Sequence, residues 1–250
     1  MFPYIPYLLT YPSGSSPALS RRRKNTGVNL TYTPKLTNAT IKRAVRDYRN
    51  GGARKQRVVT KYGEISNWDV SNVTNMGGLF WVATSFNQPL NKWNVSKVTN
   101  MSWMLSDASS FNQPLNKWNV SNVTDMWSMF NDARAFNQPL NNWNVSNVTH
   151  MSYMFRGASS FNQPLNNWNV SNVTHMILMF WGARSFNQPL NNWNVSNVTS
   201  MEMMFRAARS FNQPLNKWNV SKVTNMGGMF YGANSFNAAQ QVEPSFTSKR

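Results

Sequence analysis

Hydrophobic and polar positions along the chain repeat with a fixed period of 25 residues. The segment Phe-Asn-Gln-Pro-Leu-Asn-Lys-Trp-Asn-Val-Ser begins at Phe86, and close copies of it begin at Phe111, Phe136, Phe161, Phe186 and Phe211. Tryptophans keep the same spacing, at Trp68, Trp93, Trp118, Trp143, Trp168, Trp193 and Trp218. A fixed period of this length indicates a stack of repeats, in which each copy buries its hydrophobic face against its neighbours.

One copy, residues 86–110, shows how each coil of the stack is expected to fold. The hydrophobic positions that follow a helical spacing are Val98, Met101, Met104, Leu105 and Ala108. This spacing predicts a short amphipathic helix. A short strand is expected around 87–91, where Pro89 limits the strand because it cannot donate a ladder hydrogen bond. The predicted fold is an α/β repeat solenoid of about seven coils with Met, Phe and Trp positions in its core.

The two ends of the chain depart from the repeat and divide it into four parts. Residues 1–36 are rich in Pro, Ser and Tyr and are expected to be flexible. Residues 37–64 are predicted to form a helical N-terminal cap, because their hydrophobic positions have helical spacing and the end of a solenoid needs cover. The repeat solenoid occupies 65–237, and residues 238–250 form a C-terminal tail.

Positive charge is concentrated near the N-terminus. The formal net charge is +17, and 13 of the 25 Lys and Arg residues lie within residues 1–64. Such a segment can bind phosphate groups in a salt-dependent way without reading base sequence. The candidate nucleic-acid-binding residues are Arg21, Arg22, Arg23, Lys24, Arg43, Arg46, Arg54, Lys55 and Arg57. The alternative is a solvated basic segment without a ligand.

The chain offers few residues for catalysis or metal binding. It contains no cysteine and only two histidines, His150 and His175, which occupy the same position of neighbouring copies. Two histidines without a third ligand make a weak metal site. The sequence also shows no Ser/His/Asp set, no paired carboxylates and no glycine-rich phosphate loop. We therefore expect no enzyme activity, no metal and no cofactor, and no apolar segment is long enough to predict a membrane span.

Comparison of the copies with one another separates fixed from variable positions. Positions equivalent to 86–96 hardly change, whereas those equivalent to 100, 102, 103, 106, 107 and 109 differ from copy to copy. The variable positions lie off the hydrophobic stripe of the predicted helix and are expected to face outward. Exposed aromatic and arginine side chains are typical of binding patches. The candidate binding residues are Trp103, Tyr153, Arg156, Trp181, Arg184, Arg206, Arg209 and Tyr231.

Two alternatives to a binding face at the variable positions stay open. Unconstrained surface positions drift without selection, and drift alone would also produce the differences between copies. The uniform Asn- and Gln-rich face around 87–91 is a competing surface, and its uniformity suits a repetitive ligand or no ligand.

The repeat Asn-Val-Ser-Asn-Val-Thr-x-Met-x-x-Met-Phe-x-x-Ala-x-Ser-Phe-Asn-Gln resembles that of the BspA-like leucine-rich-repeat surface-protein family. Members of this family occur in mycoplasmas, other bacteria, protists and giant DNA viruses. The resemblance covers residues 65–237. It implies a right-handed, leucine-rich-repeat-like solenoid that serves in attachment or protein interaction, and it implies no enzyme activity.

The sequence therefore favours a non-enzymatic interaction scaffold that binds a protein or glycan partner through the solenoid surface. The alternative is a structural or packaging protein of a virus-like particle, in which residues 1–64 bind nucleic acid. A third hypothesis is a regular Thr/Asn surface that binds an ordered lattice such as ice or chitin. A cytoplasmic or virion-associated location is favoured over secretion, because Asn-x-Ser/Thr sites recur throughout the repeats and would attract glycans. The sequence leaves the oligomeric state open.

Overall fold

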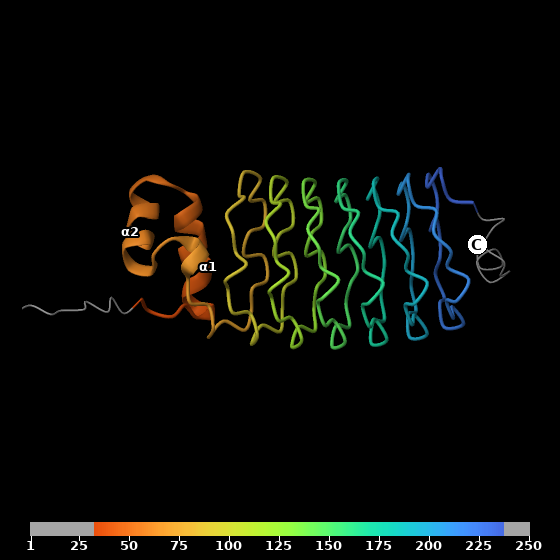
Figure 1. Ribbon diagram of the computed structural model, residues 1–250, viewed down its shortest axis with the longest axis horizontal. Coiled ribbons are helices and arrows are strands. Elements are labelled where there is room, and N and C mark those ends of the chain that lie inside the picture. Colours follow the sequence, from red (N-terminus) through yellow and green to blue (C-terminus); the bar gives the residue numbers. More distant parts are fainter. Residues whose placement is uncertain (1–32, 238–250) are drawn as a thin grey trace, which may run out of the picture. The chain divides into compact units, whose positions relative to one another are not determined.

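The structure is a computed structural model that describes residues 33–237 (Figure 1). Two α-helices come first, α1 (Asn38–Arg49) and α2 (Gly52–Tyr62), followed by the 3-10 helix η1 (Ile65–Asn67). The remaining residues form a row of coils that lie side by side, one per 25-residue repeat, as the sequence predicted (Figure 1). The predicted flexible segment 1–36, apart from residues 33–36, and the predicted tail 238–250 lie outside the described residues.

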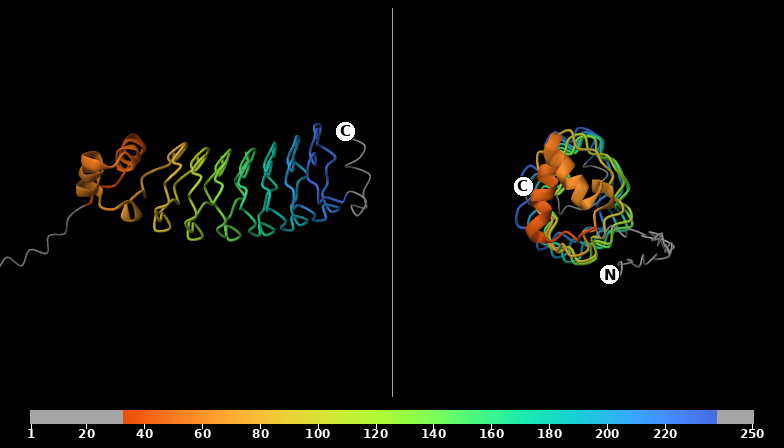
Figure 2. Two further views of the ribbon diagram at one scale, coloured as in Figure 1. Left: turned by 90° about the horizontal axis from the view of Figure 1, so that it is seen from above. Right: turned by 90° about the vertical axis from the view of Figure 1, so that its left-hand side faces the viewer.

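The two helices form the N-terminal cap that the sequence predicted. α1 begins with a capping box. The side-chain oxygen of Thr40 accepts the backbone N–H of Thr37, and the side-chain oxygen of Thr37 accepts the backbone N–H of Thr40. The buried face of α1 consists of Ile41, Ala44, Val45 and Tyr48. Viewed along the stack, the coils superpose on one rounded outline, and the helices lie across its end (Figure 2). No helix among residues 33–237 is long and apolar enough to cross a membrane.

The coils contain neither the helix predicted at 98–108 nor the strand predicted at 87–91, so both predictions were wrong. Along 101–108 the backbone N–H groups alternate between two partners. Met104 donates to the carbonyl of Met101 in the same coil (3.2 Å), whereas Leu105 donates to the carbonyl of Met129 in the next coil (2.9 Å). A helix cannot form, because every second N–H is bonded to the neighbouring coil. The helical spacing of the hydrophobic positions instead comes from successive three-residue turns.

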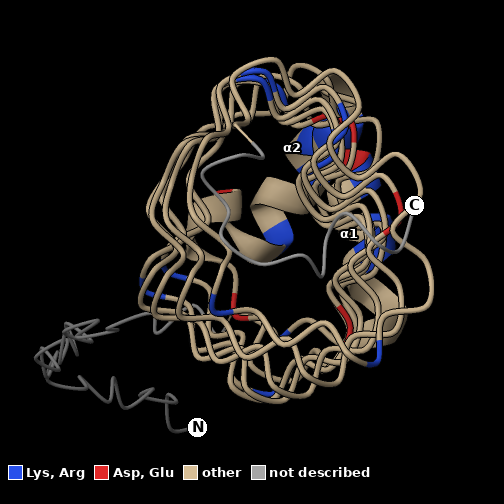
Figure 3. Cartoon of the chain, turned by 90° about the vertical axis from the view of Figure 1, so that its right-hand side faces the viewer, with Lys and Arg blue, Asp and Glu red and all other residues tan. Residues whose placement is uncertain are grey.

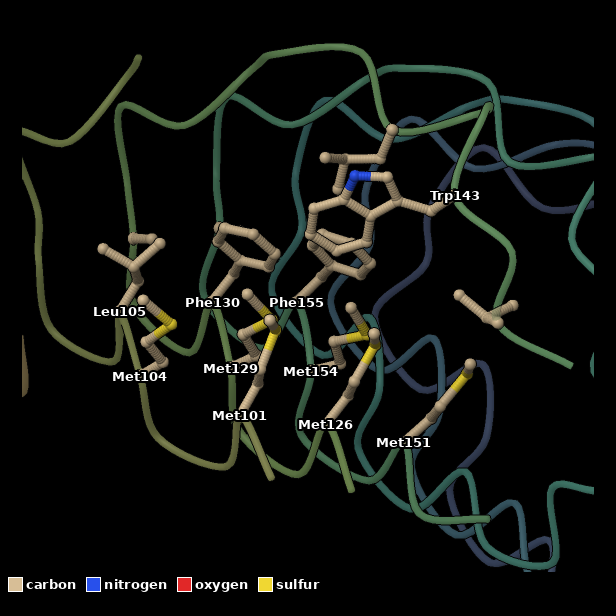
Figure 4. Packing of buried hydrophobic residues seen from close by; sticks show 14 of the residues in the cluster. Met101, Met104, Leu105, Met126, Met129, Phe130, Trp143, Met151, Met154 and Phe155 are labelled. Carbon is tan, nitrogen blue, oxygen red and sulfur yellow. The ribbon is translucent and has the colours of Figure 1, made fainter. Parts of the chain in front are cut away.

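The core consists of equivalent side chains stacked from coil to coil. The phenylalanines that follow the Phe86 series lie with ring centroids 6.0–6.1 Å apart and nearly parallel. The tryptophans from Trp118 to Trp218 are stacked at 6.3–6.5 Å. Figure 4 shows Met101, Met126 and Met151 in a row, near a second stack of phenylalanines that includes Phe130 and Phe155. The prediction that Met, Phe and Trp positions form the core is confirmed.

Side-chain amides also bond along the stack. The Oδ1 atom of Asn137 accepts the backbone N–H of Asn162 (3.0 Å) and the Nε2 group of Gln163 (3.1 Å). Asn137 in turn donates its own backbone N–H to Oδ1 of Asn112 (3.0 Å). This ladder gives the uniform Asn/Gln positions a structural role, because each coil supplies hydrogen bonds that the next one needs.

Candidate ligand-binding groove

Variable positions of successive coils gather in one groove along the side of the stack. The aromatic and arginine side chains in its lining are Trp103, Trp127, Tyr153, Arg156, Trp181 and Arg206. The volume of this hollow is about 700 Å³. A neighbouring hollow of about 430 Å³ shares Trp103 and continues toward Trp81 and Lys42. We call the two hollows together the aromatic groove.

The rings of the aromatic groove form a continuous row. Trp81 lies 6.1 Å from Trp103, Trp103 lies 5.0 Å from Trp127, and Trp127 lies 6.4 Å from Tyr153, measured between ring centroids. Each pair is packed edge to face, with interplanar angles of 75°, 86° and 78°. Trp81 and Trp127 remain 55% and 41% exposed. Exposed apolar side chains that lie next to one another in this way are typical of interaction sites.

Two arginines stack on aromatic rings farther along the groove. The guanidinium of Arg156 lies 4.1 Å from the ring centroid of Trp181, and it donates to the carboxylate of Asp132 (2.8 Å). Gly157 makes room for that carboxylate, because a Cβ atom at position 157 would overlap it. The charge of Arg156 is therefore compensated and its plane is fixed.

Arg206 differs from Arg156 in its charge balance. Its guanidinium lies 4.9 Å from the ring centroid of Tyr231 and contacts the sulfur of Met203 at 3.7 Å. Within residues 33–237 no carboxylate forms an ion pair with it. Arg206 thus places an uncompensated positive charge at one end of the aromatic groove.

The backbone at the position equivalent to 103 is left-handed in every coil. The first and last coils have glycine there, Gly78 (φ 65°) and Gly228 (φ 63°). The five coils between them have Trp103 (φ 58°), Ser128 (56°), Tyr153 (62°), Leu178 (53°) and Met203 (52°). This conformation costs a non-glycine residue roughly 1–2 kcal/mol. All five of these non-glycine residues line the aromatic groove, and left-handed non-glycine residues also occur outside it, at Val82, Asp107, Asp132 and Ala207.

All tryptophans outside the core series lie on the aromatic groove. The chain has 11 tryptophans, and those outside the 25-residue series are Trp81, Trp103, Trp127 and Trp181. The only tyrosines after residue 62 are Tyr153 and Tyr231. Each of these six aromatic residues belongs to a different coil; those of the first five coils line the groove, and Tyr231 of the seventh adjoins it. The sixth coil contributes Met203 and Arg206 instead.

The structure brings together most of the binding residues predicted from the sequence. Five of the eight line the groove, namely Trp103, Tyr153, Arg156, Trp181 and Arg206. Tyr231 adjoins it through Arg206, whereas Arg184 and Arg209 are exposed and do not line it. Sequence reasoning did not single out Trp127, although it is a tryptophan outside the 25-residue series and could have been found on that ground.

The basic residues predicted to bind nucleic acid are only partly gathered. Figure 3 shows Lys and Arg residues on several sides of the coils as well as on the two helices. Arg46 and Lys55 line a separate hollow of about 450 Å³ together with Arg49, which donates to two backbone carbonyls of the first coil. Burial lowers the pKa of Arg49. The candidates that lie on α1 and α2 but do not line this hollow are Arg43, Arg54 and Arg57. Arg21, Arg22, Arg23 and Lys24 lie outside the described residues.

Two ionisable groups near the cap have shifted pKa values. Burial raises the pKa of Tyr48 to about 12, and the hydrogen bond that its hydroxyl donates to Glu64 (2.7 Å) adds to the effect. The pKa of Asp69 is lowered, first by its hydrogen bond to Ser71 and also by the charge of Lys35.

The two histidines stack on each other at the same position of adjacent coils. The rings of His150 and His175 are nearly parallel, with centroids 6.1 Å apart. Among the described residues no group of three or more His, Cys, Asp or Glu side chains could hold a metal ion.

Two overlapping stretches of the chain, residues 53–164 and 138–243, match the model of a family described as "Mycoplasma protein of unknown function, DUF285". Together they include nearly all of α2 and all of the coils. No curated protein and no solved structure matches the chain.

Proposed function

The chain belongs to the DUF285 family, and on this premise we propose that it is a non-enzymatic interaction scaffold that binds a protein or glycan partner in the aromatic groove. The observation that carries the proposal is the regular contribution of one aromatic side chain by each of the first five coils, with Tyr231 of the seventh coil beside Arg206. These side chains come from three different positions of the repeat, so copying of the repeat does not account for their alignment. Tryptophan, tyrosine and arginine are the residues most enriched at binding hot spots.

The finer description of the fold belongs to the same proposal. The repeat is similar to that of BspA-like leucine-rich-repeat surface proteins, and this similarity supports an attachment or interaction role. It also leads us to place the coils among right-handed, leucine-rich-repeat-like solenoids.

A panel of immobilised peptides and oligosaccharides would test this function with the intact chain. Tyr153→Gly should weaken binding of the retained ligands about tenfold or more, because it removes a groove aromatic. The variant should still fold, because glycine adopts the φ of 62° at this position without strain. Asn192→Ala, on an exposed part of another face, is the control and should leave binding unchanged. Retained ligands that bind Tyr153→Gly as tightly as the unchanged protein would exclude the groove as their site.

A structural or packaging role with nucleic acid is the second candidate. The hollow lined by Arg46, Arg49 and Lys55 favours it, because three cationic side chains gather there and, within residues 33–237, only Arg46 of the three pairs with a carboxylate, that of Asp47 (3.4 Å). A combined Arg46→Gln and Lys55→Gln variant should bind single-stranded DNA more weakly at low salt and show a smaller salt dependence. An unchanged affinity and salt dependence would exclude this hollow as the nucleic-acid-binding site.

A further inference from the structure

The spacing of rings in the aromatic groove restricts the shape of the ligand. Neighbouring rings lie 6.1, 5.0 and 6.4 Å apart along the row from Trp81 to Tyr153. In an extended polypeptide, alternate side chains point the same way and lie about 6.6 Å apart. A polyproline helix presents the same face only every third residue, about 9 Å apart. The ring spacing therefore suits an extended chain with one side chain per coil.

The orientation of the rings restricts the chemistry of the ligand. Because each ring is nearly perpendicular to its neighbour, the row has alternating ridges and notches and no flat, coplanar platform. Nucleobases stack on ring faces, and the C–H faces of sugar rings pack on the same kind of surface. Branched aliphatic side chains such as leucine can instead enter the notches between perpendicular rings.

The charges of the groove restrict the ends of the ligand. At its centre Arg156 is paired with Asp132 (2.8 Å), which also pairs with Arg134 outside the groove lining (3.8 Å). One end has the uncompensated guanidinium of Arg206, and the other has the ammonium group of Lys42, which forms no ion pair within residues 33–237. An acidic side chain at either end of the ligand would complement these charges.

From these three restrictions we propose that the aromatic groove binds an extended polypeptide segment that lies along the stack. The segment has a hydrophobic side chain at every second residue and an acidic residue at each end. Between the coil of Trp81 and the coil of Arg206 it spans about ten to twelve residues, at two residues per coil. This inference rests on the proposed function and names the partner of the same groove.

Labelled synthetic peptides of twelve residues provide the test, with fluorescence anisotropy of the full chain as the measurement. The first peptide alternates Leu and Ser and has Asp at both ends. The second has the same composition, with its leucines in adjacent pairs. The third keeps the alternation and has Lys at both ends. The first peptide should bind about tenfold more tightly than either of the others, because only it matches both the ring spacing and the charges.

Groove variants locate the binding. Trp127→Ala should weaken binding of the first peptide about thirtyfold, as is typical of a tryptophan hot spot, and Tyr153→Gly should weaken it in the same direction. Arg206→Gln should reduce the preference for Asp over Lys ends. Lys217→Gln removes a charge from an exposed position outside the groove and should leave that preference intact.

The outcomes separate this inference from the proposed function. Equal binding of the alternating and paired-leucine peptides would overturn the inference, and so would the absence of binding at about 1 mM peptide. Chitohexaose and an oligothymidylate serve as competing probes. Binding of chitohexaose alone, with loss in Trp127→Ala, would overturn the polypeptide inference and leave the scaffold function standing. If the peptide binds and neither Trp127→Ala nor Tyr153→Gly weakens the binding, both the polypeptide inference and the proposed function of the groove are contradicted.

Discussion

Replacement of Trp168 by phenylalanine tests whether the stacked tryptophans hold the coils together. Trp168 is 2% exposed and lies between Trp143 and Trp193, with ring centroids 6.5 and 6.4 Å away. Its indole N–H donates to the carbonyl of Leu140 in the preceding coil (3.0 Å). Phenylalanine keeps an aromatic ring in the stack but cannot make this bond, and its smaller size leaves a void.

The expected loss of stability follows from these contacts. The lost hydrogen bond accounts for about 1 kcal/mol, and the carbonyl of Leu140 avoids the full penalty because it still accepts the backbone N–H of Trp143. The lost apolar contact and the void add about 1–2 kcal/mol. Trp168→Phe should therefore lower the free energy of unfolding by about 2–3 kcal/mol.

Urea unfolding followed by circular dichroism would measure this change, with Trp181→Phe as the matched control. Trp181 undergoes the same chemical change, but it is only half-buried and lies in the aromatic groove. Its replacement should cost less than about 1 kcal/mol. A loss below about 1 kcal/mol for Trp168→Phe, or equal losses in the two variants, would refute the idea that the stacked tryptophans hold the coils together.

Two further variants probe the cap and the amide ladder. The pKa of Tyr48 is raised from 10.0 to about 12, so its neutral form stabilises the fold below pH 10, and this contribution is lost as pH rises toward 12. Thermal melts of Tyr48→Phe should therefore show a smaller alkaline loss than the unchanged protein, and parallel curves would contradict the assignment. Asn137→Ala should cost about 2 kcal/mol in urea unfolding, because Asn162 loses the acceptor for its backbone N–H. Asn142→Ala, in an exposed position of the same coil, should cost almost nothing, and equal effects would exclude the ladder as the cause.

The features that repeat identically could be predicted from the sequence. The period located the coils, and the invariant Phe, Trp and Met positions identified the core, because every copy repeats the same burial. The helical cap was predictable from the spacing of Ile41, Ala44, Val45 and Tyr48. In each case the deciding interaction either lies within one copy or is the same between all copies.

The backbone of the coils could not be predicted in the same way. Hydrophobic residues three positions apart are common to an α-helix and to a series of three-residue turns. The carbonyl group that accepts every second backbone N–H decides between the helix and the turns, and this carbonyl group belongs to the next coil. The left-handed conformation at the position equivalent to 103 was signalled only by Gly78 and Gly228 in the first and last copies, because the copies between them have non-glycine residues at this position.

The aromatic groove was only partly predictable because its aromatic residues move between repeat positions. Trp127 stands at the position equivalent to 102, Tyr153 at that of 103, and Trp181 at that of 106. Comparison of one position at a time therefore shows variation, whereas the fold brings all three positions to the same surface. Regularity appears only when the aromatic residues are counted per coil.

Backbone strain in the coils occurs at two repeat positions, one of which lines the groove. The other is the position equivalent to 107, where the left-handed non-glycine residues are Val82, Asp107, Asp132 and Ala207. Five non-glycine residues at the position equivalent to 103 are left-handed, from Trp103 to Met203. At roughly 1 kcal/mol each, their combined cost is about 5 kcal/mol, which is comparable to the whole stability of many domains. The first and last coils have glycine at this position, Gly78 and Gly228, so the fold also forms with a residue that avoids this cost. Larger side chains are retained between these ends, on the surface that gathers the remaining tryptophans, and this pattern is typical of sites where stability gives way to binding.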